Sequence, residues 1–231
     1  MTLMSNRLVM RGRGLARGLG LTWVAGRLFG RREDRFAKAM RAAILEGDVV
    51  WDVGANLGHY ARRFSEWVGP GGEVVCFEPS PRNLQRLRRA CEPSANASVI
   101  ACALSDRNGT TAFVEDTEAG GANARIAAGQ TRDPNVIEVP VRCGDDLIAA
   151  GEARRPGVVK IDVEGHEYAV LQGLRRLLAE RSVRHLFVEV HFKLLDGDGR
   201  ADDVPRMIAL LRDCGYSIRW LGTSHFAAHL R

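Results

Sequence analysis

The chain has 231 residues, 45% of them apolar and 26% charged, which is typical of a globular protein and fits one large domain. No apolar stretch reaches the roughly 20 residues that a membrane-spanning helix needs, and residues 19–26 are too short and too far from the start for a good signal peptide. The five cysteines form no CxxC pair, which argues against a disulfide framework or a zinc site. We expect the cysteines to be free thiols that pack in the interior, and the protein to be cytoplasmic.

The net charge of +5 is concentrated at the N-terminus. Residues 1–41 carry nine Arg and one Lys against two acidic residues, a net charge of +8, so the other 190 residues sum to −3. A basic face spread over the fold is therefore absent, which argues against a nucleic-acid partner. The segment 1–46 is predicted to be an amphipathic helical arm, cleanest over 35–45, that either packs as an ordinary helix or contacts a membrane surface or an anionic partner. Its larger apolar residues are Leu15, Leu19, Trp23 and Phe29.

After residue 46, short apolar strands alternate with helices. The pattern predicts strands at 49–53, 73–77 and 97–104, separated by helices at 59–68 and 81–90. Two further strands, 110–115 and 136–142, flank a Gly-rich loop, and we interpret 109–142 as an insertion at the rim of the active site. The alternation resumes with strands at 158–162, 185–190, 216–221 and 225–230 and helices at 167–178 and 204–214.

This order predicts an α/β, doubly wound, mostly parallel sheet with helices on both faces. Only residues 222–224 separate the last two strands, which is too short for a parallel crossover, so the C-terminal pair must be an antiparallel hairpin. Such a hairpin is unusual for nicotinamide-binding domains and fits the Rossmann-like methyltransferase variant of the fold. We expect one such domain over residues 47–231.

The loop after the first strand reads Asp52-Val-Gly-Ala-Asn-Leu-Gly58 and is the predicted cofactor loop. In open α/β sheets, ligands bind beyond the carboxyl ends of the strands. Gly54 permits a sharp turn and a close approach to a ligand, and Gly58 lets the next helix pack against the strand. The third glycine of the dinucleotide fingerprint is missing. Two glycines suffice for S-adenosylmethionine, which has no phosphate, and we expect Asp52, Gly54, Asn56 and Gly58 to contact it.

Two acidic residues follow the next strands. Glu78 ends the second strand, 20 residues after Gly58, where a carboxylate can accept both hydroxyls of an adenosine ribose. The alternative for Glu78 is a solvated residue at the strand end. Asp106 follows the third strand and is predicted either to accept the adenine amino group or to be an ordinary turn residue.

A second polar cluster is predicted at the ends of two neighbouring strands. It comprises Asp162, Glu164, His166, Glu189 and His191. Carboxylates at apolar strand ends are costly unless they are used or paired. The alternative for these residues is helix capping and an ion pair with Lys160.

The chain resembles the FkbM family of methyltransferases over roughly residues 45–221. The segments that carry the resemblance are Val50-Trp-Asp-Val-Gly-Ala-Asn-Leu-Gly58, Phe77-Glu-Pro79, Val159-Lys-Ile-Asp-Val-Glu-Gly-His-Glu167 and Val188-Glu-Val-His191. The resemblance implies methyl transfer from S-adenosylmethionine to a hydroxyl, often of a sugar, glycolipid or secondary metabolite. The acceptor pocket is expected to involve 1–46 and 109–142, which match no assignable motif.

Two catalytic schemes stay open. A carboxylate or imidazole can act as general base for the acceptor hydroxyl, or a divalent metal, magnesium or manganese, can acidify it. Asp162, Glu189 and His191 suit either scheme, with Asp162 and Glu189 as the candidate metal ligands.

Two other classes of protein fit the sequence less well than this enzyme. A nucleic-acid methylase is disfavoured because residues 162–165 lack the proline and aromatic residue of the adenine enzymes and no Pro-Cys occurs. A non-catalytic cofactor-binding scaffold is the other alternative, and the acidic cluster argues against it.

Overall fold

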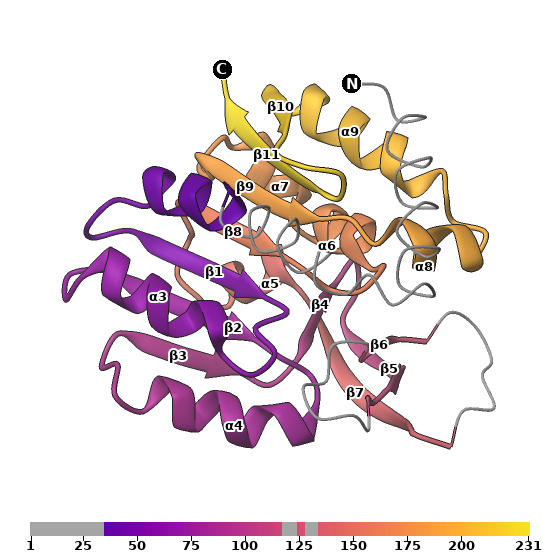
Figure 1. The fold of residues 1–231 in the computed structure, drawn as a ribbon, viewed down its shortest axis with the longest axis horizontal. Helices are drawn as coiled ribbons and strands as arrows, with labels where there is room; N and C mark the ends of the chain where they lie inside the picture. Colours follow the sequence, from indigo (N-terminus) through magenta and orange to yellow (C-terminus); the bar gives the residue numbers. More distant parts are fainter. Residues whose placement is uncertain (1–34, 117–123, 128–133) are drawn as a thin grey trace, which may run out of the picture.

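The computed structural model describes residues 35–116, 124–127 and 134–231. Its larger sheet has seven strands in the order β10-β11-β9-β8-β1-β2-β3 (Figure 1). These strands are β1 (Val49–Val53), β2 (Glu73–Phe77), β3 (Ala97–Ile100), β8 (Val158–Ile161), β9 (His185–Glu189), β10 (Tyr216–Trp220) and β11 (His225–Leu230). Strand β11 runs antiparallel to both of its neighbours, and the pairs among β9, β8, β1, β2 and β3 are parallel. The predicted parallel sheet and its C-terminal hairpin are confirmed.

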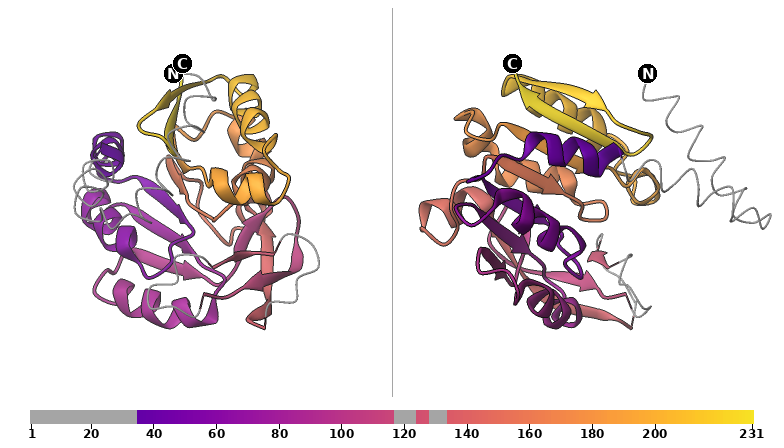
Figure 2. Two further views of the ribbon diagram at one scale, coloured as in Figure 1. Left: turned by 45° about the vertical axis from the view of Figure 1, so that its right-hand side comes forward. Right: turned by 60° about the vertical axis from the view of Figure 1, so that its left-hand side comes forward.

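Helices cover both faces of this sheet, so the fold is doubly wound (Figure 2). One face packs against helix 35–43, α3 (His59–Val68) and α4 (Pro81–Cys91). The other packs against α6 (Glu167–Gly173), α7 (Arg175–Ala179) and α9 (Asp203–Asp213). All five residues of β1 are buried because alternate side chains enter the two layers: Val50 contacts the first and Trp51 the second.

The predicted third strand, 97–104, is wrong as a single element. The backbone N–H of Cys102 donates to the carbonyl of Ile100 at 3.0 Å, and this tight turn redirects the chain. The residues beyond it form β4 (Ala103–Ser105), which belongs to a second, four-stranded sheet of order β4-β7-β5-β6. The predicted strands of the 109–142 segment are present as β5 (Gly109–Val114) and β7 (Val136–Cys143), and β6 (Arg125–Ile126) adds a short edge.

The predicted helix 167–178 is broken in two at Leu174. The carboxylate of Asp145 accepts hydrogen bonds from the backbone N–H groups of Arg176 (2.7 Å) and Leu177 (3.0 Å), which caps a new helix start. Asp145 lies on α5 (Gly144–Ala149), which the sequence pattern did not predict, and α8 (Phe192–Gly197) was also missed. Both are short, six-residue helices with little periodic signal.

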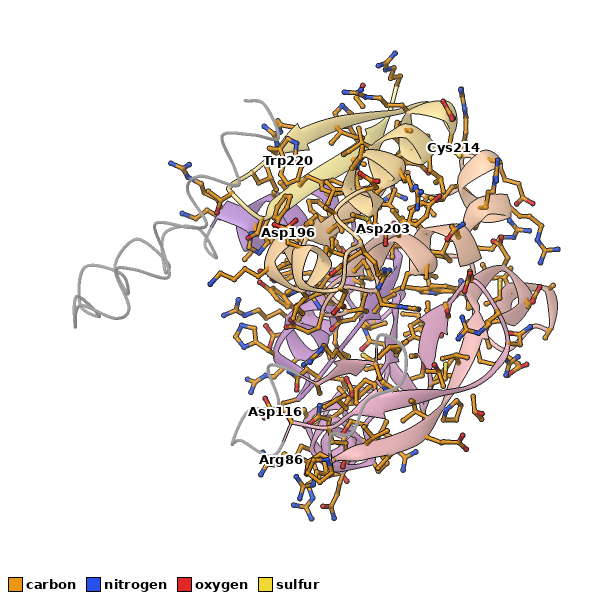
Figure 3. All side chains as sticks on the ribbon, turned by 90° about the vertical axis from the view of Figure 1, so that its right-hand side faces the viewer. Arg86, Asp116, Asp196, Asp203, Cys214 and Trp220 are labelled. Carbon is orange, nitrogen blue, oxygen red and sulfur yellow. The ribbon has the colours of Figure 1, made fainter. Side chains whose placement is uncertain are left out.

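The two edges of the large sheet lie at opposite ends of the molecule. Figure 3 places Trp220 of β10 at one end and Arg86 of α4 at the other. Helix 35–43 agrees with the cleanest part of the predicted N-terminal arm. The remainder of that arm, including its four larger apolar residues, lies outside the described residues. Within the described ranges, no helix combines the length and the apolar character needed to cross a membrane.

Candidate functional site

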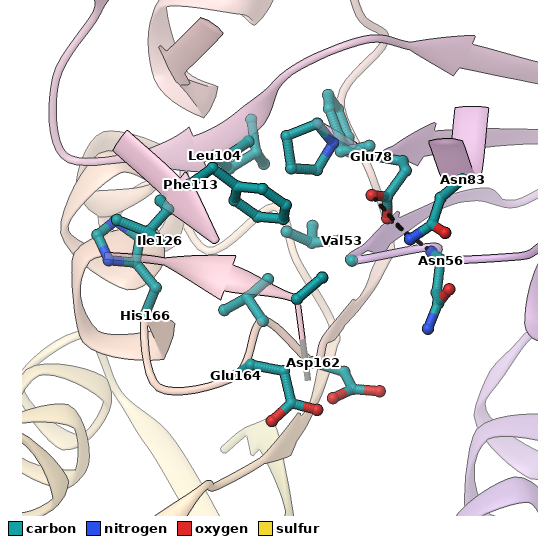
Figure 4. A pocket seen from close by; sticks show the side chains of 16 residues that line it. Val53, Asn56, Glu78, Asn83, Leu104, Phe113, Ile126, Asp162, Glu164 and His166 are labelled. Atoms are coloured by element: carbon teal, nitrogen blue, oxygen red, sulfur yellow. Dashed lines mark hydrogen bonds between the residues drawn. The ribbon is translucent and has the colours of Figure 1, made fainter. Parts of the chain in front are cut away.

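A cavity of about 620 Å³, counted out to the solvent at its mouth, lies beyond the carboxyl ends of β1, β2 and β8. This is the edge at which open α/β sheets bind ligands. The second sheet forms the opposite wall (Figure 4). The lining residues are Val53, Gly54, Asn56, Phe77, Glu78, Pro79, Asn83, Ala103, Leu104, Phe113, Ala124, Ile126, Asp162, Val163, Glu164 and His166.

The two glycines of the loop after β1 are required for different structural reasons. Gly54 has φ +78°, and a Cβ there would lie 1.9 Å from the carbonyl oxygen of Asp162. The close approach is therefore to the end of the neighbouring strand, while the residue also lines the cavity. At Gly58, with φ +86°, a Cβ would lie 2.9 Å from the Cβ of Ala90. Gly58 thus gives α3 room against α4, rather than against the strand as the sequence suggested.

Glu78 lies at the polar end of the cavity, beside Asn56 and Asn83 (Figure 4). One carboxylate oxygen accepts the backbone N–H of Asn56 at 2.9 Å. The other accepts the backbone N–H of Ser80 at 2.9 Å and the amide of Asn83 at 3.4 Å. Glu78 is only 4% exposed, and burial raises the pKa of its carboxyl group despite these donors. The oxygen that accepts from Asn56 has a lone pair left, and the 3.4 Å contact of Asn83 with the other oxygen is long, so the group is held in place with capacity left for a ligand.

Asp52 does not line the cavity, although it belongs to the predicted cofactor loop. Its carboxylate is fully buried and accepts a hydrogen bond from Nζ of Lys160 at 2.9 Å. Nζ also donates to the carbonyl of Gly54 at 3.2 Å and lies 3.6 Å from Asp162. Burial opposes the charge of Lys160, but Asp52 and Asp162 outweigh it and raise the pKa of Lys160. Lys160 therefore connects the loop after β1 to the end of β8.

The predicted acidic cluster forms at the adjacent ends of β8 and β9, with His191 at its centre. Nε2 of His191 lies 3.2 Å from Glu164 and 3.6 Å from Asp162, and Nδ1 lies 2.7 Å from the fully buried Glu167. Burial opposes a charge on this ring, but the hydrogen bonds to Glu164 and Glu167 outweigh it and raise the pKa of His191 well above its usual value. The carboxylates on both sides of the ring therefore favour its protonated form.

The sequence favoured Glu189 over Glu164 as a catalytic residue, but the position of Glu164 in the structure says more about the site. It lines the cavity beside Asp162, and its backbone adopts φ +51°, a left-handed conformation that is rare outside glycine and recurs at functional sites. Burial raises the pKa of Glu164, with His191 acting in the opposite direction. The sequence signal was present in the Asp162-Val-Glu-Gly165 run, but the backbone geometry was not readable from it.

Three other predicted residues lie apart from this centre. The carboxylate of Glu189 accepts a hydrogen bond from Nε2 of His225 at 3.1 Å. Its interaction with His191 is electrostatic and acts over a longer distance. His166 lines the far side of the cavity, 3.0 Å from the Ser105 hydroxyl, and burial lowers the pKa of His166 to about 4. Asp106 is exposed, accepts a hydrogen bond from Ser105 at 3.0 Å and is absent from the described lining.

The apolar wall of the cavity is the part that sequence reasoning missed. Leu104 of β4, Phe113 of β5 and Ile126 of β6 line the cavity from the second sheet, together with Val53 of β1 (Figure 4). An apolar slot next to an acidic residue suits a flat aromatic ring with a polyhydroxyl substituent. The apolar character of strand 110–115 was visible, but the face on which Phe113 would lie depends on its pairing with β6 and β7.

Among the described residues, the group that could hold a metal ion is Asp162, Glu164 and His191, whose ligand atoms lie within 4.8 Å of one another. Glu189, predicted as a ligand, is not in it. Both ring nitrogens of His191 face carboxylates as donors, and an imidazolium must lose a proton before it can bind a metal. The group fits a charged histidine between carboxylates better than it fits magnesium or manganese.

Comparison with known proteins gives a consistent result. The family model described as "Methyltransferase FkbM domain" matches residues 52–218. The chain is 33% identical over 147 residues to "Hexuronic acid methyltransferase AglP" of Haloferax volcanii, a match over 63% of this chain and 57% of that protein. It is 32% identical over 200 residues to "31-O-demethyl-FK506 methyltransferase FkbM" of Streptomyces tacrolimicus, over 74% of each chain. The match thus spans little more than half of the Haloferax volcanii protein.

A crystal structure of an FkbM methyltransferase from Methylobacillus flagellatus KT resembles the fold with a TM-score of 0.54 at 18% identity. The match covers 79% of this chain and 43% of that one. At this identity the likeness concerns the fold, which is the Rossmann-like methyltransferase sheet predicted from the order of strands and helices.

Proposed function

This chain belongs to the FkbM family of methyltransferases, and from that premise we propose that it transfers the methyl group of S-adenosylmethionine to a hydroxyl of a sugar, glycolipid or secondary metabolite. One observation carries the proposal. A single cavity at the carboxyl edge of the sheet has a buried, oriented Glu78 at one end and the carboxylates of Asp162 and Glu164 at the other. The name of one relative, which refers to a 31-O-demethyl compound, supports a hydroxyl acceptor.

The described residues fit the cofactor. Glu78 offers acceptors for a ribose diol, and the apolar slot beside Phe113 and Leu104 suits the adenine ring. When bound, S-adenosylmethionine supplies a methyl group activated by the positive charge of its sulfonium. Carboxylates at the other end of the cavity favour a cationic ligand over an anionic dinucleotide. Asn56, at φ +50°, uses its backbone N–H to orient Glu78 and also lines the cavity, where we expect it to contact the cofactor.

The acceptor hydroxyl must lose its proton as its oxygen is methylated. Asp162 and Glu164 line the cavity and are the carboxylates placed to take that proton. Since carboxylates lie against both ring nitrogens of His191 and raise its pKa, we assign it the task of orienting these carboxylates and balancing their charge. Glu189 lies outside this group, and its carboxylate is hydrogen-bonded to His225. General-base catalysis of this kind contributes about 10²–10⁴-fold to the rate.

The test is methyl transfer from radiolabelled S-adenosylmethionine into a panel of glycosides, glycolipids and polyketide alcohols. We expect incorporation that requires the acceptor and is lost in Asp162→Asn. Glu66→Gln is the matched control, because Glu66 lies on the surface of α3 with a 61% exposed side chain. Binding of S-adenosylhomocysteine without transfer to any acceptor would favour the non-catalytic alternative, and absence of binding would overturn the cofactor assignment.

A further inference from the structure

The helices on one face of the large sheet carry a strong excess of positive charge. Helix 35–43, α3 and α4 together hold nine Arg and Lys against one acidic residue, a net charge of +8. On the other face, α6, α7 and α9 hold four Arg against three acidic residues, a net charge of +1. The absence of a basic face, predicted from the balance of −3 over residues 42–231, is therefore wrong, because acidic residues elsewhere in the fold offset the cations of α3 and α4.

The three basic helices form one continuous layer (Figure 1). The guanidinium of Arg41, on helix 35–43, lies 5.8 Å from the ring centroid of Trp67 on α3. Helices α3 and α4 pack directly together, since a Cβ on Gly58 would lie 2.9 Å from the Cβ of Ala90. The apolar sides of all three helices pack on the sheet, and their charged sides face outwards. The nine exposed cations are Arg35, Lys38, Arg41, Arg62, Arg63, Arg82, Arg86, Arg88 and Arg89.

Few of these cations have a carboxylate beside them. Arg62 pairs with Glu66 at 3.3 Å, and Arg82 lies 3.8 Å from Glu115. The other seven form no ion pair with a carboxylate in the part of the chain that the structure describes. Like charges gathered on one face repel one another, so this layer gains stability when an anionic partner neutralises it.

The surroundings of these cations suit a membrane surface better than a nucleic acid. Trp67 has the guanidinium of Arg41 over its ring, and Tyr60 has that of Arg63 at 5.9 Å, so neither ring is an open platform for stacking on bases. The cations lie on the outer side of a helical layer, and none of them lines the cavity. Leu45, directly after helix 35–43, is the one large apolar side chain that is exposed among the described residues, at 57%. Basic residues beside an exposed leucine are typical of an interfacial surface.

The same combination continues in the sequence that leads into helix 35–43. Residues 1–34 contain seven Arg against two acidic residues, together with Leu15, Leu19, Trp23 and Phe29. We infer that the layer of helix 35–43, α3 and α4 binds the surface of an anionic lipid bilayer. The exposed Arg and Lys side chains contact the lipid phosphates, and Leu45 enters the interfacial region. This inference does not depend on the proposed methyl transfer.

Co-sedimentation of the full chain with phospholipid vesicles tests this surface. The vesicles consist of phosphatidylcholine alone or of phosphatidylcholine and phosphatidylglycerol in equal parts. We expect binding to the mixed vesicles only. Binding should weaken at least tenfold when salt is raised to about 1 M, where the Debye length is about 3 Å. Equal binding to both kinds of vesicle, or binding that salt does not weaken, would overturn the inference.

A triple variant connects the binding to the described layer. Lys38→Gln/Arg63→Gln/Arg89→Gln removes one exposed cation from each of the three helices, and none of the three has a described ion pair. Affinity for the mixed vesicles should fall at least tenfold, because each basic side chain near an anionic surface adds to the attraction. Unchanged affinity would overturn the inference, because residues 1–34 alone would then account for binding.

The matched control is Arg175→Gln/Arg206→Gln/Arg212→Gln, which removes the same charge from α7 and α9 on the other face of the sheet. This variant should bind the mixed vesicles as the wild-type protein does. An equal loss in both triple variants would show a response to net charge without a defined face and would contradict the proposal. Tighter binding of single-stranded RNA or duplex DNA than of the vesicles, at the same salt concentration, would assign the layer to nucleic acid and also contradict it.

Discussion

Replacement of Lys160 by methionine tests how the two halves of the site are joined. The ammonium group is buried between Asp52, the carbonyl of Gly54 and Asp162, at 2.9, 3.2 and 3.6 Å. Methionine is similar in length and apolar, so the variant removes the charge and the donors without opening a large void. The carboxylate of Asp52, fully buried and with one oxygen already lacking a hydrogen-bond partner, would lose its counter-charge.

The expected cost follows from this burial. Breaking a buried ion pair by removing one partner costs about 3–5 kcal/mol. Burial already raises the pKa of Asp52, so this carboxyl group takes up a proton more easily once Lys160 is gone. We therefore expect the lower end, a loss of about 3 kcal/mol in the free energy of unfolding. For a domain of this size that corresponds to a melting temperature lower by about 6–12 °C.

Urea unfolding followed by tryptophan fluorescence measures this loss. The double variant Asp52→Asn/Lys160→Met removes both charges and should regain at least half of the lost stability, because no buried charge is left unpaired. A loss below about 1 kcal/mol for Lys160→Met, or a double variant no more stable than the single one, would refute the claim that this pair holds the strand ends together.

Three further expectations concern catalysis, metal and pH. Asp162→Asn and Glu164→Gln should each lower turnover at least about 100-fold and leave the affinity for S-adenosylhomocysteine nearly unchanged. Glu189→Gln should lower turnover less, and equal losses of turnover in all three variants would contradict the assignment. Dialysis against EDTA should leave turnover intact, and activity restored only by magnesium or manganese would reinstate the metal scheme. The folded-state pKa of His166, about 4, lies below its unfolded value of about 6.5, so its contribution is present above pH 6.5 and is lost as pH falls towards 4. Between pH 6.5 and pH 4, the free energy of unfolding of His166→Gln should therefore fall by up to about 3 kcal/mol less than that of the wild-type protein. The same pH dependence in both proteins would argue against a neutral buried imidazole.

The sequence was most informative where a residue's neighbours are fixed by topology. Alternating strands and helices, and the short link before β11, were sufficient to predict the parallel sheet and its antiparallel hairpin. Because β8 pairs with β9 in parallel register, the residues that follow them had to meet at one edge. The approximate location of the Asp162 and His191 cluster followed from that alone.

Side-chain partners were less accessible from the sequence, because they depend on packing across elements. Asp52 appeared to be a cofactor residue, but Lys160, 108 positions later, occupies its carboxylate. Glu189 appeared to be equivalent to Asp162, but it pairs with His225 from the hairpin strand β11. The apolar wall at Phe113 required a second sheet, which the prediction of one uninterrupted strand over 97–104 concealed.

Calorimetric titration with S-adenosylhomocysteine, in wild-type protein and in Glu78→Gln, tests the central claim most directly. Glutamine keeps the shape of the side chain but removes one acceptor and the charge from a carboxylate that is held by Asn56, Ser80 and Asn83. We expect wild-type protein to bind S-adenosylhomocysteine and not NAD⁺, and the variant to bind it about 1–3 kcal/mol more weakly, the cost of an unpaired buried polar group. Binding of NAD⁺ in its place, no binding of S-adenosylhomocysteine, or equal affinity in the variant would contradict the assignment of this cavity as the cofactor site.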